Sequence, residues 1–122
     1  MYVATTTDDL VLRIDLNGDE AFVSNFVDDG NTPGLDDPDN LALDNQGNLW
    51  VIEDNAPSDI FIARIDRANE RRATVVERFA SLSDCAAEST GFYFDTNTKT
   101  AYVHVQHAGG ALRNDLMVAF TK

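Results

Sequence analysis

The sequence predicts an all-β fold, namely a β-propeller fragment of about two and a half four-stranded antiparallel blades. Short runs of β-branched and aromatic residues alternate with turns rich in Gly, Asn and Asp, without convincing helical periodicity. A turn followed by a strand that carries an aromatic residue also occurs twice along the chain. Asp44 and Trp50 in the first occurrence align with Asp95 and Tyr102 in the second, at offsets of 51 and 52 residues. Such a period is typical of propeller blades, and a β-sandwich with a similar number of strands is the alternative.

The first unit, residues 1–37, is expected to contain three strands. The first two are rich in β-branched and apolar residues, and the third contains two valines and two phenylalanines. The segment Asn17–Asp19 has the composition of a turn between the second and the third. The following segment, 28–38, is rich in Gly and Pro and has the character of a connection. We place the strands at residues 2–6, 10–15 and 21–27.

The second unit, 38–87, and the third unit, 88–122, are expected to follow the same plan. Gly47 can adopt a positive φ in the first turn of the second unit, and the polar stretch 67–72 is expected to be a hairpin end. A weak helical pattern over 68–79 is outweighed by its β-branched residues. We place the strands at 40–43, 49–53, 60–66 and 73–79 in the second unit and at 91–95, 100–106 and 115–121 in the third.

The predicted blades are too few to close a ring. Closed propellers need at least about four blades, and an open fragment leaves sheet faces and edges uncovered. We therefore expect residues 1–122 to form a single partial domain. Its partners would be the remaining blades of a parent protein or a second copy of the chain.

The composition excludes several classes of function. The chain carries 21 acidic and 9 basic residues, for a net charge of −12, which argues against binding to nucleic acids and to anionic membranes. This charge suits divalent cations, or an acidic surface that keeps a secreted protein soluble. The apolar runs are too short to cross a membrane, and the first residues lack the features of a signal peptide. Cys85 is the single cysteine, so we expect neither an intrachain disulfide nor a structural zinc site.

Oxygen-bearing side chains stand at the start of two predicted strands. Asp39 and Asn40 come just before the apolar residues of one strand, and Glu88 comes just before another. Calcium prefers carboxylate and amide oxygens, and successive blades would bring these three residues to one rim of the central channel. The alternatives are an Asx turn at Asp39 and Asn40, and an exposed loop acid at Glu88.

Other acidic and aromatic residues have simpler interpretations. The segment Asp15–Asp19 is similar to the start of a calcium loop but lacks the distant glutamate, so a hairpin turn is the better interpretation. Glu53–Asn55 is a weak candidate for a further metal-binding oxygen cluster. Trp50 is expected to pack between blades rather than to bind substrate.

The two histidines, His104 and His107, are more readily explained as structural residues than as phosphate donors or metal ligands. The sequence has neither a nucleophile elbow nor a glycine-rich phosphate loop, so we assign no catalytic residue.

Two of these motifs resemble those of PhoX-type alkaline phosphatases. One is Pro38–Asp44 followed by Gly47–Val51, and the other is Glu88–Phe92 followed by Val103–His107, with Ala108 where the family usually has proline. The first motif alone would also suit gluconolactonase-like and NHL-type propellers. The resemblance extends over residues 2–120 and corresponds to the C-terminal portion of the longer family members.

The resemblance implies a function and a site. Proteins of this kind are secreted or periplasmic six-bladed propellers that hydrolyse phosphate monoesters with a calcium and iron cluster in the channel. By resemblance, Asp39, Asn40 and Glu88 correspond to calcium ligands. The family's iron ligands, bridging cysteine and phosphate-binding arginine have no counterpart here, and Cys85 stands in a different context.

We therefore expect the chain to be part of a PhoX-like metal-dependent phosphatase and to be inactive alone. The alternative is a non-catalytic calcium-binding, scaffold or adhesion module, and a third interpretation is a propeller that assembles from two chains. The sequence identifies no particular phosphate ester as the substrate.

Overall fold

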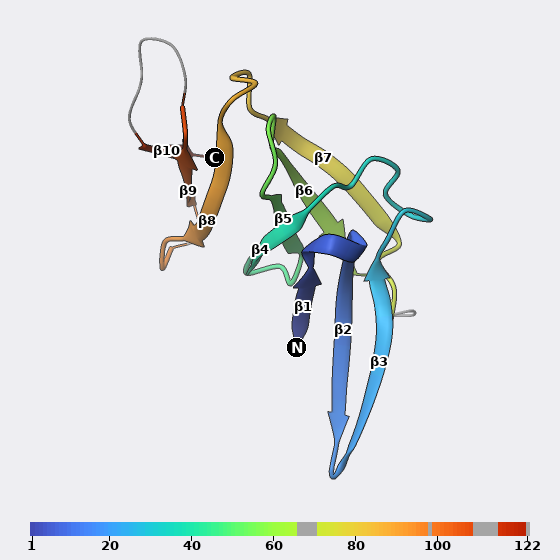
Figure 1. The fold of residues 1–122 in the computed structure, drawn as a ribbon. Coiled ribbons are helices and arrows are strands. Elements are labelled where there is room, and N and C mark those ends of the chain that lie inside the picture. The colour runs from blue at the N-terminus through green and yellow to red at the C-terminus, as the bar shows by residue number, and fades with distance from the viewer. Residues whose placement is uncertain (66–70, 98, 109–114, 122) are drawn as a thin grey trace.

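A computed structural model describes residues 1–65, 71–97, 99–108 and 115–121 of the chain, and Figure 1 shows its course. The described residues form β-strands joined by turns and loops, together with one short 3-10 helix, η1, at Thr6–Asp8. The strands are β1 (Tyr2–Thr5), β2 (Leu10–Asn17), β3 (Glu20–Val27), β4 (Pro38–Leu43), β5 (Leu49–Glu53), β6 (Asp59–Arg64), β7 (Val75–Ser81), β8 (Glu88–Phe94), β9 (Thr100–Gln106) and β10 (Leu116–Thr121).

The strands form three antiparallel sheets, with the orders β1-β2-β3, β4-β5-β6-β7 and β8-β9-β10. We call them the first, central and third sheets. Strand β4 lies beside β1 on one side and β8 on the other, so the sheets stand side by side like consecutive blades. This arrangement confirms the predicted all-β class. The described part of the chain contains no helix that is long and apolar enough to cross a membrane.

Two strand starts differ from the prediction in a way that affects the site. Strand β4 begins at Pro38 and β8 begins at Glu88, so Asp39 and Glu88 belong to the strands rather than preceding them. The sequence pattern missed the start of β8 because a β-bulge interrupts its alternation, and the bulged residue is Gly91, with φ of +55°. The predicted hairpin end at 67–72 and the loops at 95–99 and 107–110 lie partly outside the described residues.

One core fills the space between the first and central sheets. Val11 and Phe26 from the first sheet pack with Val51 and Phe61 from the central sheet, and all four side chains are almost fully buried. Burial of a side chain of this kind contributes about 1.5–3 kcal/mol. This packing holds β1 against β4 and so positions the acidic residues at their ends.

A second, aromatic core joins the central and third sheets. The ring of Trp50 lies 5.2 Å from Phe92 and 5.3 Å from Phe94, measured between ring centroids. Phe79 meets the same indole at 4.8 Å, edge to face. Trp50 is only 9% exposed, which confirms that it packs between neighbouring sheets.

The loop between β3 and β4 is held by polar contacts at its beginning. Arg72 donates from both terminal nitrogens to the carboxylate of Asp28, and this hydrogen bonding holds the pKa of Asp28 below its usual value. The side-chain amide of Asn31 donates to the carbonyls of Phe26 and Ala73, at 3.1 Å each. These contacts fix the path of the chain toward the acidic residues that precede β4.

Candidate metal site at the acidic rim

Several strand ends meet at one edge of the molecule. The hydroxyl of Thr6, after β1, donates to the carbonyl of Pro38 at the start of β4 (3.1 Å). The amide of Asp54, after β5, donates to the carbonyl of Asp37 (2.9 Å). We call this edge the acidic rim and define it by six carboxylates: Asp9, Asp36, Asp37, Asp39, Asp54 and Glu88.

Asp39 reaches the rim because of a β-bulge. Pro38 pairs with Glu53 and Asn40 pairs with Ile52, which leaves Asp39 as the extra residue in β4. A bulge changes the direction of a side chain, and Asp39 is exposed. The side-chain amide of Asn40 donates to Oδ2 of Asp39 at 2.7 Å. This contact uses an N–H of Asn40 and therefore leaves its carbonyl oxygen as the atom that would bind a cation.

Glu88 is held by the neighbouring strand. Its Oε2 accepts a hydrogen bond from the side-chain amide of Gln106 at 3.0 Å, and Nε2 of His107 lies 3.8 Å from the same oxygen. The Glu88 side chain is 29% exposed, so it remains accessible from the rim. His107 adopts a left-handed conformation with φ of 58° immediately after β9. Its ring therefore lies beside Glu88 at the rim.

The carboxyl of Asp54 interacts electrostatically with both Asp39 and Glu88. Burial raises its pKa above the usual value, and the nearby carboxylates of Asp39, Glu88 and Asp37 raise it further, while His107 acts in the opposite direction. Acidic groups from the starts of β4 and β8 are therefore close enough to the Asp54 carboxyl, just after β5, to disfavour its ionised form. A divalent cation would relieve this repulsion, so the donor set fits calcium. The role of Asp39, Asn40 and Glu88 as ligands remains a prediction.

The sequence did not reveal a second group of carboxylates at the rim. Asp9, Asp36 and Asp37 each place an oxygen within 4.8 Å of the others. The amide of Asp37 donates to Oδ1 of Asp9 at 2.8 Å, and both residues have left-handed φ values, of 48° and 51°. The nearness of Asp36 and Asp37 to Asp39 in the sequence could have indicated that they belong to the same site. Nothing in the sequence indicates this for Asp9, because it meets them only through the packing of β1 beside β4.

Glu53 is a structural residue rather than a metal ligand. It is 2% exposed, and its two oxygens accept hydrogen bonds from the backbone amides of Asp36 (2.8 Å) and Asp59 (3.0 Å). Burial raises the pKa of Glu53 to about 7. The weak metal interpretation of Glu53 is therefore wrong, because its carboxylate fastens the loops on either side of β5, whereas its neighbour Asp54 lies at the rim.

The remaining residues of interest are the Asp15–Asp19 segment, His104 and Cys85. The segment Asp15–Asp19 forms part of the β2–β3 hairpin, with Gly18 at φ of 63°, as the hairpin interpretation predicts. His104 lies on the outer face of the third sheet, where it pairs with Met117. Cys85 is an exposed free thiol.

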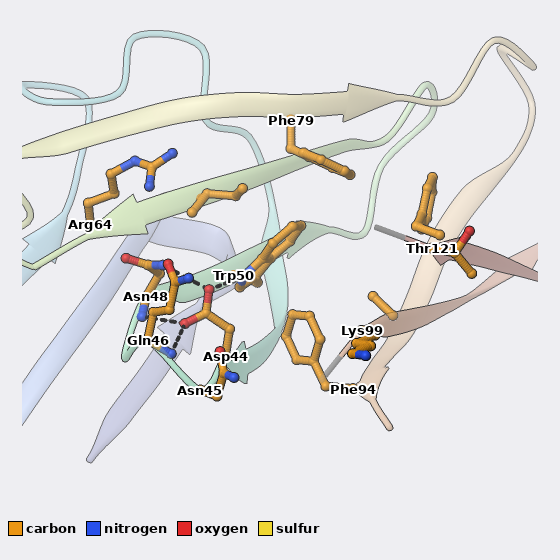
Figure 2. Close-up of a pocket in the computed structure, with 13 residues that line it drawn as sticks. Asp44, Asn45, Gln46, Asn48, Trp50, Arg64, Phe79, Phe94, Lys99 and Thr121 are labelled. Carbon is orange, nitrogen blue, oxygen red and sulfur yellow. Dashed lines mark hydrogen bonds between the residues drawn. The ribbon is translucent and has the colours of Figure 1, made fainter. Parts of the chain in front are cut away.

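A hollow of about 310 Å³ opens between the central and third sheets, and Figure 2 shows its lining. Asp44, which follows β4, accepts hydrogen bonds there from the side-chain amide of Asn48 (2.8 Å), from the backbone amides of Asn48 (2.8 Å) and Gln46 (2.9 Å), and from the Trp50 indole (3.2 Å). These bonds outweigh burial and lower the pKa of Asp44. Because Asp44 follows the end of β4 and Asp39 lies at its start, the hollow and the rim are at opposite ends of the strand.

Comparison with known proteins supports the sequence resemblance. A family model described as "Alkaline phosphatase PhoX" matches residues 3–109, which is most of the chain. Searches of curated proteins and of solved structures gave no match.

Proposed function

The chain belongs to the PhoX alkaline phosphatase family, and we propose that it supplies part of the calcium site of a phosphatase of this type. The proposal rests on the packing of β4 beside β8, which bear Asp39 and Glu88, and on the effect of both carboxylates in raising the pKa of Asp54. Asp39, Asn40 and Glu88 are the proposed ligands, and Asp54 is a further carboxylate beside them. Carboxylates and an amide carbonyl form the oxygen-rich donor set that calcium requires.

The residues of the chain would hold and orient the cation. The hydrogen bond from Gln106 fixes one oxygen of Glu88, and the hydrogen bond from Asn40 fixes one oxygen of Asp39. Such second contacts keep ligand carboxylates in place and strengthen metal binding. When bound, calcium would polarise a phosphoryl oxygen of a phosphate monoester.

The proposed site is shared with other parts of a complete propeller. By family resemblance, the iron ligands, the bridging cysteine and the phosphate-binding arginine would come from blades that this chain does not contain. We therefore expect the chain to be inactive alone and its partners to include further blades. A secreted or periplasmic location is part of the same proposal.

Calorimetric titration with calcium tests the proposed ligands. We expect a dissociation constant of about 10⁻⁴ M, in the range of extracellular calcium modules, and an increase of about tenfold or more in Asp39→Asn and in Glu88→Gln. Asp19→Asn is the matched control, because Asp19 is exposed at the β2–β3 turn. Equal affinities in all four proteins would refute the assignment of ligands.

An assay with an aryl phosphate tests the shared nature of the site. With calcium and iron supplied, the isolated chain should give no turnover, whereas robust turnover would show that the chain holds a complete catalytic centre. Calcium binding without hydrolysis in a longer protein that contains this chain would instead favour the non-catalytic scaffold function.

A further inference from the structure

Two fully buried serines lie directly behind the acidic rim. Ser58 immediately precedes β6 of the central sheet, and Ser89 follows Glu88 in β8 of the third sheet. Both residues are 0% exposed, and their hydroxyl oxygens are in hydrogen-bonding contact. We propose that these two hydroxyls form a positioning bridge, which fixes Glu88 relative to Asp54 in the calcium site. The inference rests on the proposed calcium-binding function and adds two positioning residues to it.

The hydrogen bonds of the bridge have one possible direction. The hydroxyl of Ser58 donates to the main-chain carbonyl of Glu53 at 2.7 Å, because a carbonyl oxygen can only accept. A serine has a single hydroxyl hydrogen, so the hydroxyl of Ser89 donates to Oγ of Ser58. The carbonyl of Glu53 belongs to the peptide bond that precedes Asp54, and Ser89 directly follows Glu88. The bridge therefore joins the main chain beside two of the rim carboxylates.

The bridge connects two sheets that are separate in their backbone hydrogen bonding. Strand β8 belongs to the third sheet and packs across β4 and β5 of the central sheet. The hydrophobic effect is not directional, so apolar contacts alone hold such a joint together without setting an exact position. Hydrogen bonds depend strongly on distance and angle. The two buried hydroxyls therefore fix β8 along the central sheet more sharply than the aromatic core around Trp50 does.

The same hydrogen-bond network reaches the segment that precedes β4. The Glu53 carboxylate accepts hydrogen bonds from the backbone amides of Asp36 (2.8 Å) and Asp59 (3.0 Å), while its main-chain carbonyl accepts the hydrogen bond from Ser58. Asp36 stands three residues before Asp39 in the sequence. Glu53 thus holds the approach to β4 with its side chain and the bridge to β8 with its main chain. The two strands that bear the proposed ligands are therefore both fastened to one residue of β5.

The effect of the bridge on position is expected to exceed its effect on stability. Replacing hydrogen-bonded partners by apolar groups is often nearly neutral for stability, because buried methyl groups gain from the hydrophobic effect. A satisfied network of buried polar groups, in contrast, specifies a single arrangement of the segments that it joins. Calcium requires several oxygens at about 2.3–2.6 Å at the same time. Loss of the bridge should therefore weaken calcium binding more than it weakens the fold.

Calorimetric titration of the full chain with calcium tests the bridge. Ser89→Ala removes the link between the sheets and leaves the bond from Ser58 to Glu53 in place. It should raise the dissociation constant of calcium roughly threefold to tenfold. Val103→Ala is the matched control, because Val103 is fully buried in the aromatic core between the same two sheets and has no hydrogen-bonding side chain. This control should lower Tm but keep the calcium affinity within about twofold of the native value.

The two serines should act as a unit. Ser58→Ala breaks the same link and also removes the hydroxyl donor of the Glu53 carbonyl, so it should bind calcium at least as weakly as Ser89→Ala. The double variant should match Ser58→Ala within about twofold, because the second substitution breaks no further bond of the bridge. Losses of affinity that multiply in the double variant would show that each serine acts separately, and would overturn the bridge.

Amide hydrogen exchange without calcium separates positioning from a general loss of stability. The backbone amides of Asp54 and Leu82 each donate a hydrogen bond of 2.9 Å beside the bridge, and that of Asp44 donates one of 3.0 Å at the other end of β4. In Ser89→Ala, exchange at Asp54 and Leu82 should accelerate at least about threefold relative to Asp44. Equal acceleration at all three amides would show that the variant only weakens the fold, and would overturn the proposal.

The calcium titrations also distinguish failure of the bridge from failure of the calcium site. Native binding that is unchanged in Ser89→Ala would refute the positioning bridge and leave the proposed ligands standing. A native chain that binds no calcium would refute the calcium site, and the positioning role with it.

Discussion

Replacing Glu53 with glutamine is expected to remove a large pH dependence of stability. Burial raises the pKa of Glu53 from 4.5 to about 7, so the folded protein favours the protonated carboxyl. The free energy of unfolding should therefore fall as the pH rises from 4.5 to 7 and level off above that. The difference between the two pKa values corresponds to about 3 kcal/mol.

The Glu53→Gln variant cannot ionise at this position, so it should lack this loss of stability. Its amide has one carbonyl oxygen for the two N–H donors of Asp36 and Asp59, which should cost about 1–3 kcal/mol at pH 4.5. Above pH 7 the variant should be about as stable as the native protein or more so. The free energy of unfolding of both proteins can be measured by urea unfolding, followed by Trp50 fluorescence with a chelator present. Parallel stability curves across this pH range would refute the reasoning.

Two further substitutions test the turn and the aromatic core. Asp44→Ala should lower the free energy of unfolding by about 1–3 kcal/mol near neutral pH, because four hydrogen-bond donors of Gln46, Asn48 and Trp50 lose their acceptor. The exposed Asp19→Ala should change it little. Since the pKa of Asp44 is lowered, its contribution should be lost as the pH falls below 3.8 and through the lower folded value. Trp50→Ala should cost about 3–5 kcal/mol in thermal or denaturant unfolding, against less than about 1 kcal/mol for Phe22→Ala, whose side chain is 48% exposed.

Much of the fold follows from local sequence patterns. The first four residues of β5, Leu49–Ile52, are a continuous apolar run, and the hairpin turns before β5 and between β2 and β3 are marked by glycines with a positive φ, Gly47 at 83° and Gly18 at 63°. The prediction that Trp50 packs between sheets is confirmed, because a large aromatic ring between the apolar residues Leu49 and Val51 belongs in a core. The start of β8 was predicted late because the bulge at Gly91 breaks the two-residue period.

The site was less predictable because it depends on contacts between distant segments. Asp39 and Glu88 were identified from motifs, but the same signal did not separate Asp54, at the rim, from Glu53, which is buried one residue earlier. Neighbouring side chains of a strand point to opposite sides of the sheet, but only the register and packing of the sheet decide which side faces the core. The contact between Asp9 and Asp37 spans 28 residues and depends on how β1 packs beside β4, which no local pattern specifies.

The location of bound calcium tests the central claim most directly. Backbone amide resonances of the isotopically labelled chain can be followed by NMR as calcium is added. We expect the largest shifts at Asp39, Asn40 and Glu88, with smaller ones at Asp54 and none at the Asp19 turn. No shifts, or shifts centred on Asp9 and Asp36 with Glu88 unchanged, would contradict the claim that β4 and β8 together supply the calcium ligands.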